Sequence, residues 1–251
     1  MNECEKRKVS AIILAAGKGT RMKSDMAKVL HPLCGKPLLT YSVNVAREVG
    51  VEKIAVIIGH QADLVRGVFK DQGLIFLEQH EQLGTGHAVL QAKDTFRNYD
   101  GTILILCGDV PLLLSSTARA LLEDHISEKS VVTVLTTILD DPYGYGRVIK
   151  AGGEGEVVRI VEEKDALPDE KIIKEINTGI YCVECNFLFE AVAEIRNENV
   201  QNEYYLTDIV GIAWKKGLKI RSFIAANSVE VMGINTLDDL GRASECLMIC
   251  K

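Results

Sequence analysis

The sequence of 251 residues has no long hydrophobic run, no excess of basic charge and no internal repeat. No apolar stretch reaches the roughly 18 residues that a membrane-spanning helix needs, so we expect no membrane association. The 29 lysines and arginines are outnumbered by 35 aspartates and glutamates, which gives a net charge of −6. A protein that binds nucleic acid non-specifically needs a basic surface, so this class is disfavoured. Small anionic ligands stay compatible, because a local group of cations can hold them.

The seven cysteine residues are odd in number and scattered along the chain. This pattern does not suit a disulfide-stabilised fold. The spacing of Cys182, Cys185, Cys246 and Cys250 allows a four-thiolate zinc site. However, Cys182 and Cys185 fall in a strand-like run, where residues three apart point to opposite faces. The histidines show no metal spacing, so we expect no zinc site and assign no histidine a catalytic role.

The N-terminus resembles a signal peptide only in its first residues. Charged residues Met1–Lys8 precede an apolar stretch, Val9–Ala16. The segment Gly17–Arg21 ends that stretch too early for a secretory signal, so we interpret it as a first β-strand. We therefore expect a cytoplasmic protein.

Strand-like and helix-like segments alternate through the first half. Continuous apolar runs such as Val9–Ala15 are typical of strands buried on both faces of a parallel sheet. The expected strands are Val9–Ala15, Lys53–Gly59, Leu74–Leu77, Ile103–Cys107 and Val131–Ile138. The expected helices are Leu38–Val49, with Pro37 in its first turn and Gly50 closing it, Ala62–Lys70, Thr85–Asp94 and Ser115–Ser127. This order predicts an α/β fold with a doubly wound, mostly parallel sheet and right-handed crossovers.

The second half changes character at Asp141. Glycine-rich turns and short β segments occupy Asp141–Lys164. Further strands are expected at Asn177–Val183, Leu218–Ala225 and Val229–Gly233, and helices at Asn186–Ile195, Leu206–Lys216 and Thr236–Cys250. We expect this half to be an antiparallel elaboration that covers the pocket of the first half.

The segment from Leu14 to Met22, with Lys28 six residues later, is the clearest chemical motif. It follows a buried strand, and ligands in open α/β sheets bind beyond the carboxyl ends of strands. Gly17 and Gly19 let backbone N–H groups approach phosphate oxygens, and Lys18, Arg21 and Lys28 add positive charge. The segment matches neither the Walker motif nor Gly-x-Gly-x-x-Gly, because Met22 replaces the third glycine. A solvated glycine-rich turn is the alternative, but the complete pattern favours a triphosphate site.

These residues resemble the signature of the sugar-1-phosphate nucleotidyltransferases. Further matches resemble the bacterial N-acetylglucosamine-1-phosphate uridylyltransferases within that family. They are Gln79–Ala88, Gly108–Pro111, Gly144–Arg147, Val161-Glu162, Ile176–Gly179, Glu203–Asp208 and Gly233–Asn235. The resemblance covers about residues 9–245 and implies a Rossmann-like nucleotide-sugar transferase fold. It implies one domain over 1–251, with a nucleotide-binding half at about 9–140, a sugar-binding half at about 141–235 and a C-terminal helix at 236–251.

The resemblance also implies roles for individual residues. Leu14, Ala15, Ala16 and Gly17 would line the uridine and phosphate site, with Gly108 also against the substrate. Arg21 and Lys28 would hold the triphosphate as the catalytic cations. Gln79, Gln82, Gly84 and Thr85 would read the uracil. Gly146, Glu162, Asn177 and Thr207 would hold the sugar. Asp109 and Asn235 would bind Mg²⁺, with Asn235 also touching substrate.

The chemistry of the residues agrees with these implied roles. Asp109 follows a buried strand, and Mg²⁺ takes one or two protein oxygens together with phosphates and waters. The alternatives are a turn residue at Asp109 and an N-cap at Asn235. Gln79 and Gln82 offer amide groups that match the edge of uracil, with a solvated loop as the alternative. Glu162 could accept hydrogen bonds from sugar hydroxyls or only pair with a lysine.

Two departures from the family pattern are visible. Cys107 stands where the family often has an aromatic residue, which leaves the exact sugar open. Bifunctional members continue into an acetyltransferase β-helix with hexapeptide repeats, and these 251 residues contain none. We therefore expect no acetyltransferase here, and both a natural absence and a truncation fit the sequence. Nothing in the sequence specifies an oligomeric state.

The implied reaction joins UTP and N-acetylglucosamine 1-phosphate into UDP-N-acetylglucosamine and pyrophosphate. The sugar phosphate is already an anion, so no general base is required, and positioning and charge neutralisation would supply the catalysis. Another sugar 1-phosphate, such as glucose 1-phosphate with UTP or dTTP, is the nearest alternative. A non-catalytic nucleotide-sugar sensor is the alternative from another class.

Overall fold

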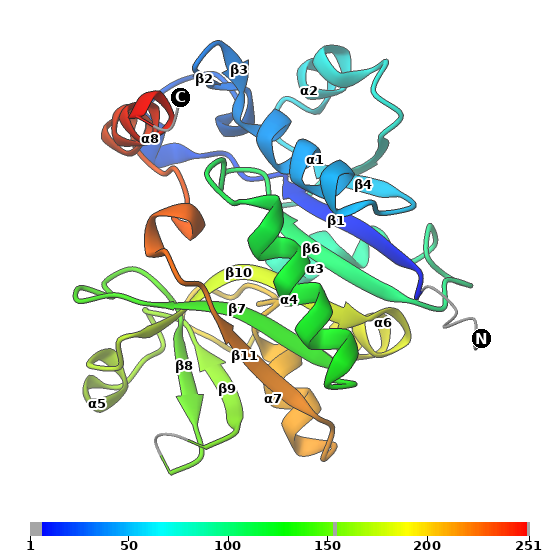
Figure 1. Ribbon diagram of the computed structural model, residues 1–251, viewed down its shortest axis with the longest axis vertical. Coiled ribbons are helices and arrows are strands. Elements are labelled where there is room, and N and C mark those ends of the chain that lie inside the picture. Colours follow the sequence, from blue (N-terminus) through cyan, green and yellow to red (C-terminus); the bar gives the residue numbers. More distant parts are fainter. Residues whose placement is uncertain (1–6, 153–154, 250–251) are drawn as a thin grey trace.

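One mixed sheet forms the centre of the molecule in the computed structural model, which describes residues 7–152 and 155–249 (Figure 1). Its strands run in the order β11 (Ile220–Ile224), β7 (Val132–Ile138), β10 (Glu175–Glu184), β6 (Thr102–Cys107), β1 (Val9–Ala15), β4 (Ile54–Ile58) and β5 (Ile75–Glu78). The pairs β6–β1, β1–β4, β4–β5 and β7–β11 are parallel. The predicted mostly parallel sheet is confirmed.

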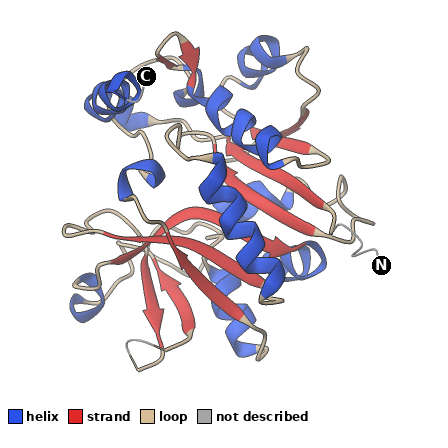
Figure 2. Cartoon of the chain, in the orientation of Figure 1, coloured by secondary structure: helices blue, strands red, loops and turns tan. Residues whose placement is uncertain are grey.

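Helices cover both faces of this sheet, as Figure 2 shows. On one face lie α1 (Leu38–Val49), α2 (Ala62–Phe69) and α4 (Ser115–Ser127). On the other lie α3 (Thr85–Leu90), α6 (Cys185–Glu194) and α7 (Asp208–Lys215). Successive residues of β1 alternate between these layers, since Ala11 and Ile13 join the first core and Ile12 joins the second. The sheet is therefore doubly wound, as the continuous apolar strands predict.

The antiparallel part centres on β10. This strand is antiparallel to both β6 and β7, and it also pairs with β8 (Arg147–Lys150), which pairs in turn with β9 (Val157–Val161). The expected antiparallel elaboration is confirmed for these three strands, whereas β11 departs from it by pairing parallel with β7. A strand from late in the sequence thus lies between two strands of the first half.

The C-terminal helix α8 (Leu237–Ile249) packs near the glycine-rich segment. A third, small core joins Met22, Leu33, Leu38, Ile234 and Ala243. These residues come from η1 (Thr20–Met22), the hairpin of β2 (Pro32–Leu33) and β3 (Lys36–Pro37), α1 and the chain around α8, while η2 (Lys28–Leu30) carries Lys28. Figure 1 shows α8 beside this hairpin. The packing holds the segment before α8 close to the end of β1.

Several details of the secondary structure differ from the sequence-based expectation. Val229–Gly233 is not a strand, because Ser228–Val231 forms the 3₁₀ helix η3. Asn227 starts that turn by accepting a hydrogen bond from Val229 N at 3.0 Å, and Glu230 turns inward to accept from Thr117 Oγ1 at 2.8 Å. Pro37 precedes α1 rather than lying in its first turn, α3 ends at Leu90, and α5 (Pro168–Lys171) was not expected.

The cysteines of the zinc alternative do not share a site among the described residues. Cys182 packs in the core beneath α1 and α4, whereas Cys185 packs in the core on the other face. Burial raises the pKa of both thiols, that of Cys185 to about 11, which disfavours the thiolate that a metal needs. Cys250 lies outside the described residues. In the described part of the chain, no helix is long and apolar enough to span a membrane.

Candidate active site

A cavity of about 390 Å³ opens at the carboxyl ends of β1 and β6. The predicted site residues that line it are Leu14, Ala15, Ala16, Gly17, Arg21, Lys28, Gln79, Gln82, Gly84, Thr85, Asp109 and Asn235. They come from five separate stretches of the sequence and meet here because parallel strands end at one edge of the sheet. Gly19, which was also expected beside the phosphates, lines the cavity too, and so do residues that were not predicted to contact substrate, namely Thr20, Val29, Ala88, Cys107 and Glu203.

Lys28 and Arg21 converge on Asn235 at one end of this cavity. The Asn235 Oδ1 accepts from Lys28 Nζ at 2.9 Å and from Arg21 Nη2 at 2.8 Å. Lys28 Nζ also forms an ion pair with Asp109 Oδ2. The two side chains of the ion pair are 12% and 27% exposed, so both can still reach a ligand in the cavity. The two cations, Lys28 and Arg21, have one neutral partner and one singly charged partner between them. This leaves a net positive charge that suits a polyanionic ligand.

The same group fits a divalent cation that takes oxygen ligands. Asp109 supplies a carboxylate and Asn235 an amide oxygen, and Lys28 already bridges the two as a cation. No cluster of three or more His, Cys, Asp or Glu side chains arranged for a metal occurs within residues 7–152 and 155–249. A hard cation held by two protein oxygens needs phosphate oxygens and waters to complete its shell, which is the usual arrangement for Mg²⁺.

Asn235 is free for this role because Thr236 caps α8. Asp239 N donates to Thr236 Oγ1 at 3.1 Å, and Asp239 Oδ2 accepts from Thr236 N at 2.9 Å, which is a reciprocal capping arrangement. The alternative of Asn235 as the N-cap is therefore wrong. The backbone of the neighbouring segment is fixed by Ile234 N, which donates to Asp109 O at 2.8 Å. This bond joins the turn after β6 to the chain before α8.

Glycine is required where the backbone of the cavity wall is crowded. Gly19 has a φ of 62°, and an added Cβ would lie 2.6 Å from Lys28 Cβ. Gly59, which was not among the predicted site residues, directly follows β4, and an added Cβ would lie 2.9 Å from both Ala16 O and Gln82 Nε2. Larger residues at either position would displace side chains that line the cavity.

The loop carrying Gln79 to Thr85 is attached to the chain before α7. Tyr204 N donates to Leu83 O at 2.8 Å, and Gly86 N donates to Tyr204 O at 2.7 Å. Gly84 has a φ of 112°, and an added Cβ would lie 2.6 Å from Tyr204 O. Leu206 N donates to Thr85 Oγ1 at 3.0 Å. The predicted base-reading loop and the segment leading to Thr207 therefore form one unit.

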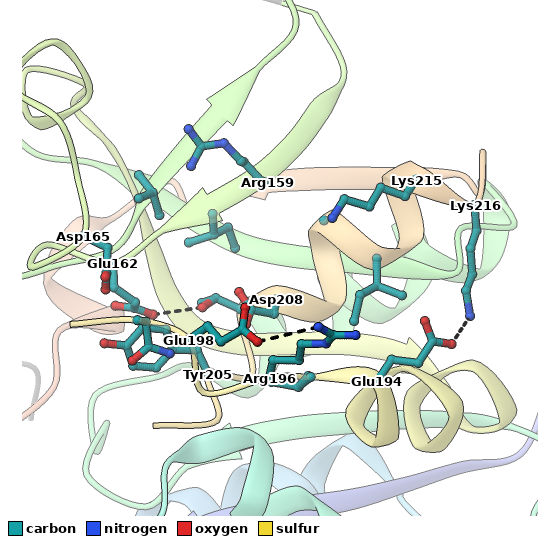
Figure 3. Close-up of a pocket in the computed structure, with 17 residues that line it drawn as sticks. Arg159, Glu162, Asp165, Glu194, Arg196, Glu198, Tyr205, Asp208, Lys215 and Lys216 are labelled. Carbon is teal, nitrogen blue, oxygen red and sulfur yellow. Dashed lines mark hydrogen bonds and ion pairs between the residues drawn. The ribbon is translucent and has the colours of Figure 1, made fainter. Parts of the chain in front are cut away.

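The predicted sugar residues lie together next to a second hollow of about 540 Å³, shown in Figure 3. Glu162 and Thr207 line it, and Thr207 Oγ1 donates to Glu162 Oε1 at 3.1 Å. A Cβ added at Gly146 would lie 3.4 Å from Glu162 Oε2 and 3.6 Å from Asn177 Cβ, so these three residues are neighbours. Gly146, Asn177 and Gly108 line neither this hollow nor the cavity beside β1.

Glu162 is electrostatically unusual. Burial raises the pKa of its carboxyl group, while the hydrogen bond from Thr207 acts in the opposite direction. The nearby carboxylates of Asp208 and Asp165 add to the increase. In Figure 3, Glu162 lies beside Asp165, and Lys215 and Lys216 lie at the far end of the hollow. No lysine pairs with Glu162 among the described residues, which disfavours the alternative of a simple surface ion pair.

Arg147 fixes the loop that contains Gly146. Its side chain is 2% exposed, and its Nη2 pairs with Glu163 Oε2 at 2.7 Å. Its other nitrogen atoms donate to the backbone oxygens of Tyr145 and Lys171. Glu163 Oε2 also accepts from Gly144 N at 3.1 Å. The hydrogen bonds of the guanidinium group and of its partner carboxylate thus hold the loop in place.

Comparison with known proteins agrees with this arrangement. The family model described as "Nucleotidyl transferase" matches residues 10–245. The chain belongs to the nucleotidyl transferase family. The match includes every predicted site residue from Leu14 to Asn235.

Two curated relatives of this nucleotidyl transferase are both named "Bifunctional protein GlmU". The protein of Geotalea daltonii is 51% identical over 243 residues, which cover 96% of this chain and 53% of the relative. The protein of Geobacter sulfurreducens is 51% identical over 237 residues, which cover 94% of this chain and 50% of the relative. The chain therefore spans about half the length of the curated relatives it matches.

A solved structure shares the fold of this nucleotidyl transferase. It is described as the crystal structure of a UDP-glucose pyrophosphorylase complexed with UDP-glucose. The TM-score is 0.76 and the identity 18%, with 97% of this chain and 100% of the other covered. At this identity the likeness establishes the fold, and with it the Rossmann-like architecture.

Cys107 occupies a tight position in the nucleotidyl transferase site. Its Sγ donates to Gly179 O at 3.4 Å. Gly179 has a φ of 81°, and an added Cβ would lie 2.9 Å from Cys107 Sγ. Burial raises the pKa of the thiol, so it stays protonated. The small side chain thus packs against the irregular part of β10.

Proposed function

We propose that this nucleotidyl transferase makes UDP-N-acetylglucosamine and pyrophosphate from UTP and N-acetylglucosamine 1-phosphate in the presence of Mg²⁺. The observation that carries the proposal is the meeting of Arg21, Lys28, Asp109 and Asn235 beside the loop of Gln79. The identity of about half of all residues to two proteins named GlmU supports the same activity.

The chemistry requires little beyond positioning and charge. An oxygen of the sugar phosphate forms a bond to the α-phosphorus of UTP, and the bond from that phosphorus to the oxygen it shares with the β-phosphorus breaks. Pyrophosphate leaves with the electron pair. The attacking oxygen is already an anion, so no side chain has to remove a proton. Arg21 and Lys28 hold the triphosphate and neutralise the charge that moves onto the leaving group.

Asp109 and Asn235 are the residues that would hold Mg²⁺. The bound metal would neutralise phosphate charge and polarise a phosphoryl oxygen. Lys28 Nζ is paired with both of these residues. Phosphate oxygens in the cavity offer Lys28 an alternative partner, so the lysine can exchange Asp109 for the substrate.

The uridine and the sugar are bound by two different groups of residues. Gln79 and Gln82 at the main cavity read the uracil, and Gly146, Glu162, Asn177 and Thr207 hold the sugar. The carboxylate of Glu162 accepts from sugar hydroxyls and is already held in place by Thr207. The backbone bonds between Leu83–Gly86 and Tyr204 keep these two regions in a fixed relation.

A substrate grid tests the proposal. Pyrophosphate release is measured for UTP, dTTP and CTP against N-acetylglucosamine 1-phosphate and glucose 1-phosphate, with Mg²⁺ and with EDTA. We expect turnover with UTP and the N-acetylated sugar and a loss of turnover in EDTA. Faster turnover with glucose 1-phosphate would support the other sugar pair. Tight binding of UDP-sugar without any pyrophosphate release would support a sensor and overturn the proposal.

A further inference from the structure

Gln79 is a buried polar side chain at the wall of the main cavity. The residue is 3% exposed and follows the end of β5, where its backbone N donates to Ile58 O at 2.8 Å. Its side-chain nitrogen, Nε2, lies 2.9 Å from Gly84 O and 3.0 Å from His87 Nδ1. An amide nitrogen has two hydrogen atoms to donate, and both of these hydrogen atoms therefore point to acceptors within the protein.

The neighbouring groups fix which way round the amide lies. Gly84 O is a carbonyl oxygen and can only accept, so the atom of Gln79 beside it must be the nitrogen. His87 Nδ1 is then faced by an N–H group and must accept as well. The neutral imidazole can do so when its hydrogen is on Nε2, and Gln91 Nε2, which lies 3.2 Å from that atom, then donates to the His87 backbone oxygen and not to the ring. Turning the amide round would place its oxygen against the oxygen of Gly84.

This leaves the Gln79 Oε1 for the ligand. Among the described residues no hydrogen bond to this oxygen occurs, and Gln79 lines the cavity. A side chain that can only accept suits a base with a ring N–H donor. Uracil carries a hydrogen on N3, whereas cytosine has an acceptor at the same position. An oxygen facing cytosine N3 would bring two acceptors together, which costs more than losing one hydrogen bond.

We infer that His87 is a positioning residue that makes this site select a nucleobase with an N3–H, uracil over cytosine, by locking the Gln79 amide. The inference rests on the proposed function and adds a residue that does not touch the substrate itself. His87 is itself held in place. It belongs to α3, its ring centroid lies 6.4 Å from that of Tyr204, and Gln91 Nε2 donates to its backbone oxygen at 2.9 Å.

The test removes the acceptor of His87 and keeps an aromatic ring. The variant His87→Phe keeps a ring beside Tyr204 and has no nitrogen, and His87→Asn restores an acceptor close to the place of Nδ1. We measure kcat and KM for UTP and for CTP with one sugar phosphate. In His87→Phe we expect the preference for UTP over CTP to fall roughly tenfold, mainly through KM, because a freed amide can turn. In His87→Asn we expect most of the preference to return.

His80→Leu is the matched control. The His80 side chain is 83% exposed, and its nearest charged partner is Glu78 at 3.5 Å. We expect its preference for UTP to equal that of the wild type. A purely structural role of His87 predicts equal losses with UTP and CTP in His87→Phe, and that result would overturn the inference.

The inference and the proposed function can fail separately. If the wild type releases no pyrophosphate, the proposed function fails, and the inference is then read from binding of UDP and CDP by calorimetry. An unchanged ratio of UDP to CDP affinity in a folded variant would overturn it. Should His87→Phe not fold, the comparison of His87→Asn with His87→Leu in the same binding assay decides between the same outcomes.

Discussion

Lys28 and Arg147 are both cations paired with a carboxylate near the proposed substrates, yet their surroundings differ. Arg147 donates to Glu163 and to the backbone oxygens of Tyr145 and Lys171, and its side chain is 2% exposed. Within residues 7–152 and 155–249, the acceptors of Lys28 are the side-chain oxygens of Asp109 and Asn235, and Lys28 borders the cavity. The first cation is fully used by the fold, whereas the second can exchange its partners for a ligand.

The comparison therefore distinguishes a structural charge, on Arg147, from a charge that is available to a ligand, on Lys28. A buried cation with several fixed acceptors stabilises one backbone arrangement, and removing it leaves a buried carboxylate without its partner. A cation at a cavity wall whose partners also face the cavity adds less to stability, because water can reach those partners when the cation is removed. Its value lies in binding a charge that forms during the reaction.

The largest effect should come from Arg147→Met. We expect the free energy of unfolding to fall by about 3–5 kcal/mol, because Glu163 would remain only 18% exposed without its cation. Urea denaturation followed by circular dichroism measures the change. Arg159→Met is the control, since the Arg159 side chain is 45% exposed in its pair with Glu170 and should contribute less than about 1 kcal/mol. Equal losses in the two variants would remove the distinction drawn for Arg147.

Lys28→Ala should show the opposite pattern. At saturating substrates we expect kcat to fall roughly 10²–10³-fold, because a cation that neutralises the transferred phosphates is lost. The free energy of unfolding should change by less than about 1 kcal/mol, since Asp109 is 27% exposed and can be hydrated. Pyrophosphate release and urea denaturation are measured side by side, with the exposed Lys36→Ala as control. Turnover near that of the wild type would mean that Lys28 has no part in the chemistry.

Gly84→Ala tests the link between the two regions. We expect a loss of about 1–3 kcal/mol, because the φ of 112° is strained for alanine and the new Cβ would lie 2.6 Å from Tyr204 O. The KM for UTP should rise with it. Gly67→Ala in α2 is the control of opposite sign, since nothing lies within 4 Å and alanine should stabilise the helix by about 0.5–1 kcal/mol. A neutral result for Gly84→Ala would show that the loop is not tied to Tyr204.

Glu162→Gln should give the smallest change in stability, with a definite dependence on pH. Burial raises the pKa of Glu162 above its ordinary value of 4.5 in the folded state, so the folded protein binds this proton more tightly than the unfolded chain does. Stability must then fall as the pH rises from about 4.5 through the raised pKa, and stay lower above it. Glutamine cannot lose a proton, so this fall should shrink in the variant.

The same variant should bind the sugar less well. We expect the KM for the sugar phosphate to rise roughly tenfold, because a neutral amide oxygen is a weaker acceptor than a carboxylate. Thermal unfolding between pH 4 and pH 8 and initial rates at pH 8 measure the two effects. The control is Glu198→Gln, whose side chain is 77% exposed and should change neither. An unchanged pH profile would show that Glu162 titrates as an ordinary surface carboxyl group.

Much of the fold follows from local patterns in the sequence. The apolar runs predict β1, β4 and β6 within a residue or two, because a strand buried on both faces has few polar positions. Gly50 ends α1 as predicted, with a φ of 88° that glycine adopts without strain. The apolar spacing around Val229 was misleading, since Glu230 is buried and bends the chain inward to reach Thr117.

By itself, the sequence determined the strands and helices of the first half, the glycine-rich segment after β1 and the residue types of the site. These depend on side-chain period and backbone preference, which act over a few residues. Only the tertiary structure decided that β10 enters between β6 and β7, that Asn235 meets Lys28 and Arg21, and that Gly84 packs on Tyr204. Each of these contacts joins residues that lie far apart in the sequence, so local sequence patterns do not indicate the partner. The contacts stabilise the protein only once the chain has folded.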